Sequence, residues 1–384
     1  MLTSSEIRKI LFTAATGIVL FSLRLDAITP DEITREEQLL QRTADDRREK
    51  AVLRFRELAL AEAEASKTKP LQERLIDKFD IALSYLESLD RNANYDSAHK
   101  RDWTQQMIFQ TLFKDIPLSW MRYQVDYRMD TSLHQHFSPN DSFIQEMGGR
   151  VDIRLHKKLI WDNDYHWGYF RYPDATTSSY FRNKIVTGLK HYPFKTSRIY
   201  HRPNFTWELK NYRYRLARVT ISQTAVNTDS KREDIVYRLD HEIGIYPYKT
   251  ISVVVHNQLG FNESNDAHQD FYDYQFFKTS QVISGSWKKW YAYAGFQFQR
   301  NNFTARQLIG TAEAEDLPLV YGGIYYTFNR FLSLGFNTIY FKSDSNYPDL
   351  EYQGATFTLG AYTNFKPSDL MDRIPGLIAK PKPV

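Results

Sequence analysis

Apolar and polar residues alternate along WMRYQVDYRMD, the stretch from Trp120 to Asp130. A β-strand sends successive side chains to opposite faces, so one face of this stretch would be apolar and the other almost wholly charged. The apolar positions are Met121, Tyr123, Val125, Tyr127 and Met129. The polar positions are Arg122, Gln124, Asp126, Arg128 and Asp130. The pattern predicts a strand that separates an apolar environment from a polar one.

The same period of two recurs through residues 118–366, between clusters of Asn, Asp, Ser, Gly and Pro. In EMGGRVDIRLH it sets the apolar Val151, Ile153 and Leu155 against the polar Arg150, Asp152 and Arg154. In DIVYRLDHEIGIY the polar face carries Arg238, Asp240 and Glu242. KTISVVVHNQLGF follows after only Pro247-Tyr248, the spacing of a tight hairpin. With the weaker candidates included, the sequence predicts about 12 strands of about 9 to 13 residues each.

Alternation alone would also fit a soluble antiparallel sandwich. Three features favour a membrane barrel instead: strands long enough to cross a bilayer at a tilt, aromatic residues at segment ends, and charges in the middle of strands. We therefore expect an all-β transmembrane antiparallel β-barrel. Its apolar positions, named above, would face lipid, and its polar positions would line the lumen.

The last alternating segment, GATFTLGAYTNF, places Phe357, Leu359, Ala361 and Phe365 on one parity. It resembles the closing strand of Gram-negative outer-membrane β-barrels, which the barrel-assembly machinery reads. Thr363 departs from that pattern, and a Pro-rich tail (367–384) follows the terminal aromatic residue. The resemblance implies an outer-membrane location, contact with outer-membrane lipid or lipopolysaccharide, and the assembly machinery as a partner.

The first residues fit an exported protein. Arg8 and Lys9 precede an apolar run from Ile10 to Leu23, and Ala27 is a small residue soon afterwards. A basic start, a short apolar run and a small residue describe a secretory signal peptide, here predicted to be residues 1–27. The alternatives are an uncleaved anchor and a buried helix, but the run is shorter than the ~20 apolar residues that span a bilayer.

Residues 28–100 have a helical character. Thr29-Pro30-Asp31-Glu32 is a good helix start, and the first helix is expected to continue to about Ser66. A second helix is predicted in LQERLIDKFDIALSYLESLD, and a connecting helix or linker in residues 101–117. One interpretation is a periplasmic helical hairpin or coiled coil that packs on itself or on copies of itself. The other is a plug or adaptor that controls a pore.

The amino-acid composition excludes several kinds of functional site. The chain has no cysteine, which excludes disulfides, thiolate metal sites and a Cys nucleophile. Aromatic residues make up 15% of the chain although its mean hydropathy is −0.55, as suits a protein with two different surfaces. The net charge of +4 is scattered, so we expect no nucleic-acid partner.

We expect neither an enzyme nor a cofactor. Outer-membrane phospholipases use a Ser and a His two residues apart, a spacing that His136-Phe137-Ser138 shares. That triplet lies in a turn-rich segment and lacks the following Asn-Gly of the family, so a loop histidine is favoured. No metal-binding motif is present, and the acidic segments 262–270 and 343–349 are more typical of solvated loops than of calcium sites.

Three functions remain open. The first is a porin or export channel with a charged lumen and an N-terminal helical plug or adaptor. The second is a non-conducting anchor that presents its helical segment to a periplasmic partner, and homo-oligomerisation through that segment is compatible with both. The third and weakest is a phospholipase-like enzyme.

Overall fold

The computed structural model describes residues 78–91, 101–118, 120–193, 198–221, 224–248, 250–267, 272–308, 311–329, 331–346 and 351–367. The predicted signal peptide, the helical segment up to residue 77 and the tail from residue 368 lie outside the described residues.

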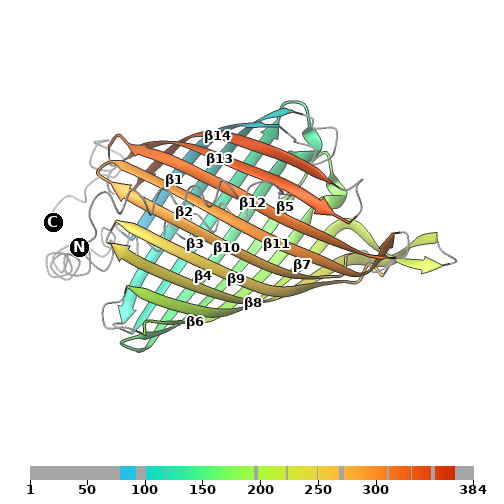
Figure 1. Cartoon of the computed structure of the whole chain (residues 1–384), viewed down its shortest axis with the longest axis horizontal. Helices are drawn as coiled ribbons and strands as arrows, with labels where there is room; N and C mark the ends of the chain where they lie inside the picture. The colour runs from blue at the N-terminus through green and yellow to red at the C-terminus, as the bar shows by residue number, and fades with distance from the viewer. Residues whose placement is uncertain are drawn as a thin grey trace, which may run out of the picture.

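Antiparallel strands form one closed sheet whose order around the barrel follows the chain (Figure 1). The fourteen strands are β1 (Phe79–Asp90), β2 (Asp102–Leu118), β3 (Met121–His134), β4 (Ser142–His156), β5 (Leu159–Arg171), β6 (Tyr180–His191), β7 (Ile199–Ile221), β8 (Thr224–Tyr248), β9 (Ile251–Ser264), β10 (Tyr274–Trp287), β11 (Trp290–Leu308), β12 (Thr311–Thr327), β13 (Leu332–Ser345) and β14 (Tyr352–Phe365). Two short 3-10 helices, η1 (Ser138–Asn140) and η2 (Thr176–Ser178), lie in the β3–β4 and β5–β6 connections. β1 pairs with both β2 and β14, which closes the barrel.

The prediction of an antiparallel barrel is confirmed, but the strand number of about 12 was too low. The two additional strands, β1 and β2, lie where helices were predicted, so those two helix predictions are wrong and the barrel begins at residue 79 instead of 118. Apolar residues spaced by three and four suggested a helix in FDIALSYLESLD. The same segment also alternates, and β1 makes ladder hydrogen bonds with two neighbouring strands. Tertiary pairing therefore overrides the local helical pattern.

The two ends of the barrel differ. At one end the strands are joined by short turns such as 157–158 and 288–289, and β1 begins and β14 ends there. At the other end the connections are longer, for example 135–141 and 172–179, and β7 and β8 extend past the neighbouring strands (Figure 1). The predicted β8–β9 hairpin is present: β8 continues through Tyr248, which pairs with Ile251 at the start of β9. In outer-membrane barrels the short turns face the periplasm.

The outer face of the barrel is apolar. Exposed Met107, Met147, Leu239 and Leu259 lie along its strands. Exposed tryptophans lie near both ends, with Trp161, Trp287 and Trp290 beside the short turns and Trp103 and Trp167 toward the loops. An apolar band with aromatic residues at both borders is what a barrel presents to a bilayer. Within the described ranges, no helix combines the length and the apolar character that a membrane crossing requires.

A charged side chain introduced on this outer face should lower the free energy of unfolding, and the loss should be larger the nearer the residue lies to the middle of the bilayer. Val151 lies in the middle of β4, whereas Leu155 lies beside the 157–158 turn, and both are exposed. We expect Val151→Arg to lower the free energy of unfolding by about 2–4 kcal/mol and Leu155→Arg by about 0–1 kcal/mol. Denaturant unfolding in lipid vesicles measures both values. Equal costs at the two positions would contradict a lipid-facing band.

Candidate functional site: the barrel interior

The polar residues that the sequence assigned to the lumen lie on the inward-facing side of β3, β4 and β8. Arg128, Asp130, Asp152, Arg238 and Asp240 are buried, and Arg122, Gln124, Asp126, Arg150 and Glu242 are half-buried. Arg154 is exposed because it lies beside the turn that ends β4. The positions expected to face lipid are on the opposite parity: Val125, Val151 and Leu155 are exposed, and Met121, Tyr123, Tyr127, Met129 and Ile153 are intermediate.

Six of the inward charges form an ion network near the short turns. We call Arg122, Arg150, Asp152, Asp162, Asp164 and Arg202 the turn-side network. Asp152 accepts hydrogen bonds at 2.7 Å from the Nε atoms of both Arg122 and Arg150. Arg202 Nε lies 2.6 Å from Asp162 Oδ2, and Arg150 lies 3.6 Å from both Asp162 and Asp164. Three arginines therefore balance three aspartates.

The absence of a side chain at Gly188 makes space for the side chains of the turn-side network. Asp162 of β5 and Asn204 of β7 flank Gly188 of β6 in the ladder. A Cβ atom at Gly188 would lie 1.9 Å from the Asn204 side-chain oxygen and 2.9 Å from Asp162 Oδ1. The missing side chain lets Asp162 and Arg202 approach each other across the intervening strand.

A second group of charges lies farther along the same wall. Arg182 donates a hydrogen bond of 2.6 Å to Glu146 and lies 4.6 Å above the Phe170 ring. His166 Nδ1 is 3.4 Å from the same carboxylate, and Arg238 reaches Glu208 at 3.5 Å. These charges are buried or half-buried, and oppositely charged partners offset the cost of removing them from water.

Toward the loops the pairing continues. Arg128 donates a hydrogen bond of 2.6 Å to Asp130, which also accepts one of 2.9 Å from Gln106. Arg232 donates one of 2.8 Å to Asp234. One side of the lumen is thus lined by ion pairs of both signs along its length.

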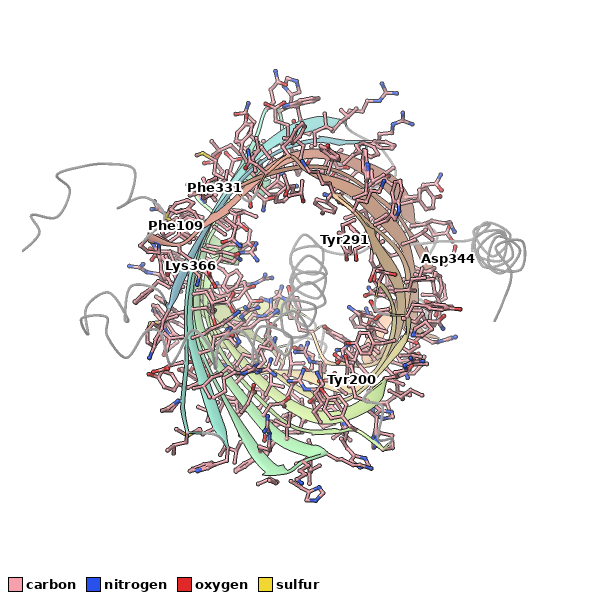
Figure 2. The ribbon with its side chains drawn as sticks, turned by 90° about the vertical axis from the view of Figure 1, so that its left-hand side faces the viewer. Phe109, Tyr200, Tyr291, Phe331, Asp344 and Lys366 are labelled. Atoms are coloured by element: carbon pink, nitrogen blue, oxygen red, sulfur yellow. The ribbon has the colours of Figure 1, made fainter. Side chains whose placement is uncertain are left out.

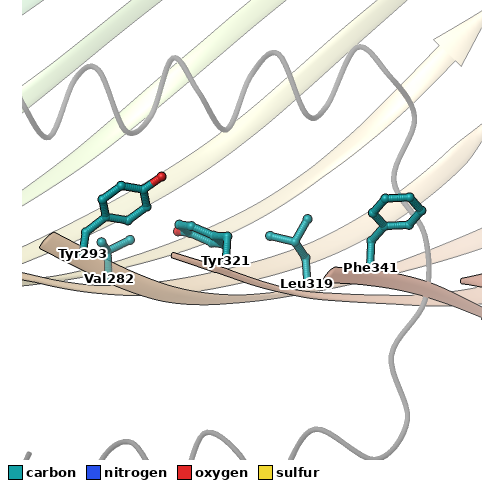
Figure 3. Packing of buried hydrophobic residues seen from close by; sticks show 5 residues of the cluster. All are labelled: Val282, Tyr293, Leu319, Tyr321 and Phe341. Atoms are coloured by element: carbon teal, nitrogen blue, oxygen red, sulfur yellow. The ribbon is translucent and has the colours of Figure 1, made fainter. Parts of the chain in front are cut away.

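The opposite side of the lumen has a different character. On the inward parity of β10 to β14 lies an apolar cluster, which we call the aromatic wall: Val282, Tyr293, Leu319, Tyr321 and Phe341, with Tyr291, Tyr325, Ile339 and Tyr352 packed against it (Figure 3). Its middle strand, β12, is seven strands from β5 in either direction around the fourteen-strand barrel, so the aromatic wall faces the turn-side network. Tyr291 and Tyr200 point inward from different strands (Figure 2).

The tyrosines of the aromatic wall are fixed in place. The Asn337 side-chain oxygen accepts hydrogen bonds from Tyr293 at 2.9 Å and Tyr325 at 2.7 Å, and its nitrogen donates to Tyr362 at 3.2 Å. Gly295 lies beneath the Tyr321 ring, where an added Cβ would come within 2.3 Å of a ring carbon. The ring therefore lies close against the sheet (Figure 3).

The sequence did not predict the aromatic wall, nor the role of Asp162, Asp164 and Arg202. A signal for the two aspartates exists in WDNDYHWGYF, where Asp162, Asp164 and His166 share one parity. Buried and less buried residues also alternate around Arg202 in β7, where every second residue is buried: Arg202, Asn204, Thr206 and Glu208.

The predicted loop triplet lies outside the lumen network. The backbone N–H groups of His136 and Phe137 donate hydrogen bonds of 2.9 Å to the Asp102 carboxylate, and Ser138 begins η1. Asp102 thereby fixes the β3–β4 connection against β2. Among the described residues, no group of three or more His, Asp or Glu side chains is arranged to hold a metal ion.

Comparisons with known proteins found no matching family model and no matching curated protein. Several solved structures are similar. Pseudomonas putida OprB is 9% identical with a TM-score of 0.44, over 78% of this chain and 97% of that one. OmpT, an outer membrane protein of Vibrio cholerae, is 12% identical with a TM-score of 0.38, over 75% and 97%. Pseudomonas aeruginosa OccK5 is 9% identical with a TM-score of 0.37, over 76% and 99%. At these values the similarity says nothing about what this chain does.

The closed sheet itself identifies the class. A closed antiparallel barrel satisfies all backbone groups within the sheet, and this one has an apolar exterior with aromatic borders and a charged interior. The chain folds as a closed antiparallel β-barrel with the two surfaces that its sequence predicted, an apolar exterior and a charged interior.

Proposed function

We propose that the chain is an outer-membrane channel for small polar solutes and has no enzymatic activity. The observation that carries this proposal is the continuous line of charged side chains on the inward face of a closed barrel. Barrels of about 8 strands are filled by their side chains and those of 16–18 strands hold an aqueous channel, so fourteen strands leave room for a water-filled path. Outer-membrane lipid or lipopolysaccharide surrounds the barrel, and the assembly machinery inserts it.

Conductance in planar bilayers tests the channel. The proposal predicts single-channel currents from the full-length protein, or from a variant that lacks residues 29–66. Heat-modifiable migration on a gel would first verify that each preparation is a folded barrel. A folded barrel that carries no current in either form would contradict the channel and favour a structural role.

One observation favours that second function. The inward charges are buried and paired rather than lined up for contact with a solute, as in the turn-side network. A non-conducting barrel of this kind would anchor the N-terminal segment in the outer membrane and present it to a periplasmic partner or to further copies of the chain.

The balance of charge in the lumen should set ion selectivity. Because acids and arginines are matched in the turn-side network, we expect the open pore to discriminate weakly between anions and cations. Replacing both Asp152 and Asp164 with asparagine leaves the three arginines in excess. The reversal potential in a salt gradient should then shift toward anion preference.

A matched control removes two acids from the outer surface. Asp316 and Asp344 lie on the outward parity of β12 and β13, so changing both to asparagine should leave the reversal potential unchanged. An equal shift from the two pairs would mean that the turn-side network does not line the path of the ions.

The finer proposal is that residues 29–66 act as a plug for this channel. That segment contains both apolar and charged residues, which is compatible with contacts to the apolar and the charged sides of the lumen. The alternative is that the segment acts as an adaptor outside the barrel.

A further inference from the structure

One side of the outer face carries polar side chains among the apolar ones. On β6 to β10, which lie side by side (Figure 1), the outward positions include His191, His201, His241, Asn257 and Thr279. His191 is opposite His201 in the ladder, and the rings of His201 and His241 lie diagonally, 5.9 Å apart. Asn257 is opposite both His241 and Thr279. These five residues therefore form one row across five neighbouring strands, which we call the outer polar row.

The middle of the outer polar row lies at mid-height of the barrel. Asn257 is in the middle of β9 (Ile251–Ser264), and Thr279 is near the middle of β10 (Tyr274–Trp287). Leu239 and Leu259, on the same outward parity of β8 and β9, are 64% and 59% exposed. In the proposed location these positions face hydrocarbon, which offers no partner to a polar group. Polar groups at this depth therefore need partners from protein.

Hydrogen bonds within the row use only part of its capacity. Thr279 donates one of 2.8 Å to the Asn257 side-chain oxygen, and the described residues offer no acceptor to the Asn257 amide nitrogen. His191 Nδ1 and His201 Nε2 share one of 2.8 Å. In a neutral pair, whichever ring donates, one N–H group and one lone pair remain unused. The ring of His241 forms no hydrogen bond with the described residues, so it adds another donor and another acceptor.

This mixture of donors and acceptors suits a second copy of the same surface. In a two-fold interface one patch meets itself, so its donors must find acceptors within an identical patch. The outer polar row meets this requirement, because its amide and imidazole N–H groups are matched by free imidazole nitrogens. A lipid carries its acceptors in the head group and ester region, and these do not reach the middle of the bilayer.

The area of this face also suits such an interface. Neighbouring strands lie about 4.8 Å apart, so five strands are about 20–24 Å wide. With an apolar band about 25 Å tall, the face covers about 500–600 Å² before the relief of the side chains is counted. Stable interfaces bury about 800 Å² per partner, which is of the same order.

We propose that the outer faces of β6 to β10 form a two-fold interface between two copies of this barrel within the membrane. The outer polar row of one copy pairs with that of the other, and exposed leucines such as Leu239 and Leu259 pack around it. The proposal rests on the membrane location in the proposed function and does not depend on conductance. Hydrogen bonds between the two rows select this side of an otherwise apolar surface for the contact.

Cysteine cross-linking in the membrane tests the contact directly, because the chain has no cysteine of its own. A residue near a two-fold axis meets its own counterpart, so single cysteines are placed in turn at the outward positions of β8 and β9, including Leu239→Cys and Asn257→Cys. A disulfide needs Cα atoms about 4.4–6.8 Å apart, so at least one position should give a covalent dimer on oxidation. The matched control is Leu83→Cys, exposed on β1 and seven strands from β8 in either direction. It should give none, and a series without dimers or an equal yield from Leu83→Cys would overturn the proposal.

A second measurement tests the polar row itself. His241→Leu with Asn257→Leu removes two polar groups from the middle of the row and adds apolar surface, and it should weaken association in lipid vesicles at least ten-fold. Photobleaching steps of singly labelled chains count the copies in each particle. The matched control, Thr111→Leu with Thr338→Leu, changes outward polar residues of β2 and β13 and should leave association unchanged. Equal association of the two double variants would contradict the proposal.

The same preparations separate this interface from the proposed channel. Heat-modifiable migration first verifies that each variant is a folded barrel. A barrel that pairs but carries no current contradicts the channel and supports the interface. A barrel that conducts but remains single in vesicles contradicts the interface and supports the channel. A folded barrel that does not fractionate with the outer membrane contradicts both.

Discussion

Replacing Arg202 with methionine is expected to lower the free energy of unfolding of the barrel by about 3–5 kcal/mol. Arg202 is buried, and it lies 2.6 Å from Asp162 and 3.7 Å from Asp164. Removing its charge leaves three aspartates of the turn-side network with two arginines. A buried carboxylate that loses its partner keeps the cost of desolvation without the compensating attraction, and that cost appears as lost stability. Denaturant unfolding followed by tryptophan fluorescence measures it.

Two further variants isolate the ion pair from the loss of packing. The double change Arg202→Met with Asp162→Leu removes both charges and keeps apolar volume, so it should be closer to the wild-type stability than either single change. Arg202→Lys keeps the charge but loses the planar guanidinium, and it should have an intermediate effect. If Arg202→Met is as stable as the wild type, water reaches this network freely and the pair contributes little.

The period of two identified most of the barrel. In β3, β4 and β8 it placed the charged residues on one parity, and all of them except Arg154 are buried or half-buried. A shift of one residue would exchange the two faces of the whole strand. It failed for β1 and β2, where the apolar spacing in FDIALSYLESLD satisfied both periods. A local pattern cannot decide between a helix and a strand when the deciding hydrogen bonds come from partners such as β14, some 270 residues away.

The sequence predicted which residues of a single strand face the lumen, but not which residues of other strands they contact. The sequence placed Arg150 and Asp152 in the lumen, but their partners Asp162 and Asp164 come from the neighbouring strand, and Arg202 comes from two strands farther on. Such contacts depend on the register between strands and on the space above Gly188, neither of which a single segment records. The aromatic wall was missed for another reason. In LPLVYGGIYY both faces of β12 are apolar, so alternation gives no signal there.

The second large effect is expected at Tyr200, which is buried on the inner face of β7. Its hydroxyl donates a hydrogen bond of 2.6 Å to Glu242, and Lys190 Nζ lies 4.0 Å above its ring. Tyr200→Ala removes the ring together with both contacts, and we expect a loss of about 3–5 kcal/mol in the free energy of unfolding. Tyr200→Phe keeps the ring and removes only the hydroxyl, so it should lose about 1–3 kcal/mol.

Gly244 provides an independent test of how this ring is seated. A Cβ at Gly244 would lie 2.1 Å from a carbon of the Tyr200 ring, so Gly244→Ala should displace the ring and lose about 1–3 kcal/mol. In the double variant with Tyr200→Ala the added methyl group meets no ring. The combined loss in the free energy of unfolding should therefore be smaller than the sum of the two single losses, by roughly the cost of the clash. Additive losses would mean that the ring does not rest on Gly244. Tyr200 above Gly244 and Tyr321 above Gly295 both lie close against the sheet, so each ring occupies less of the lumen than one that stands away from the wall.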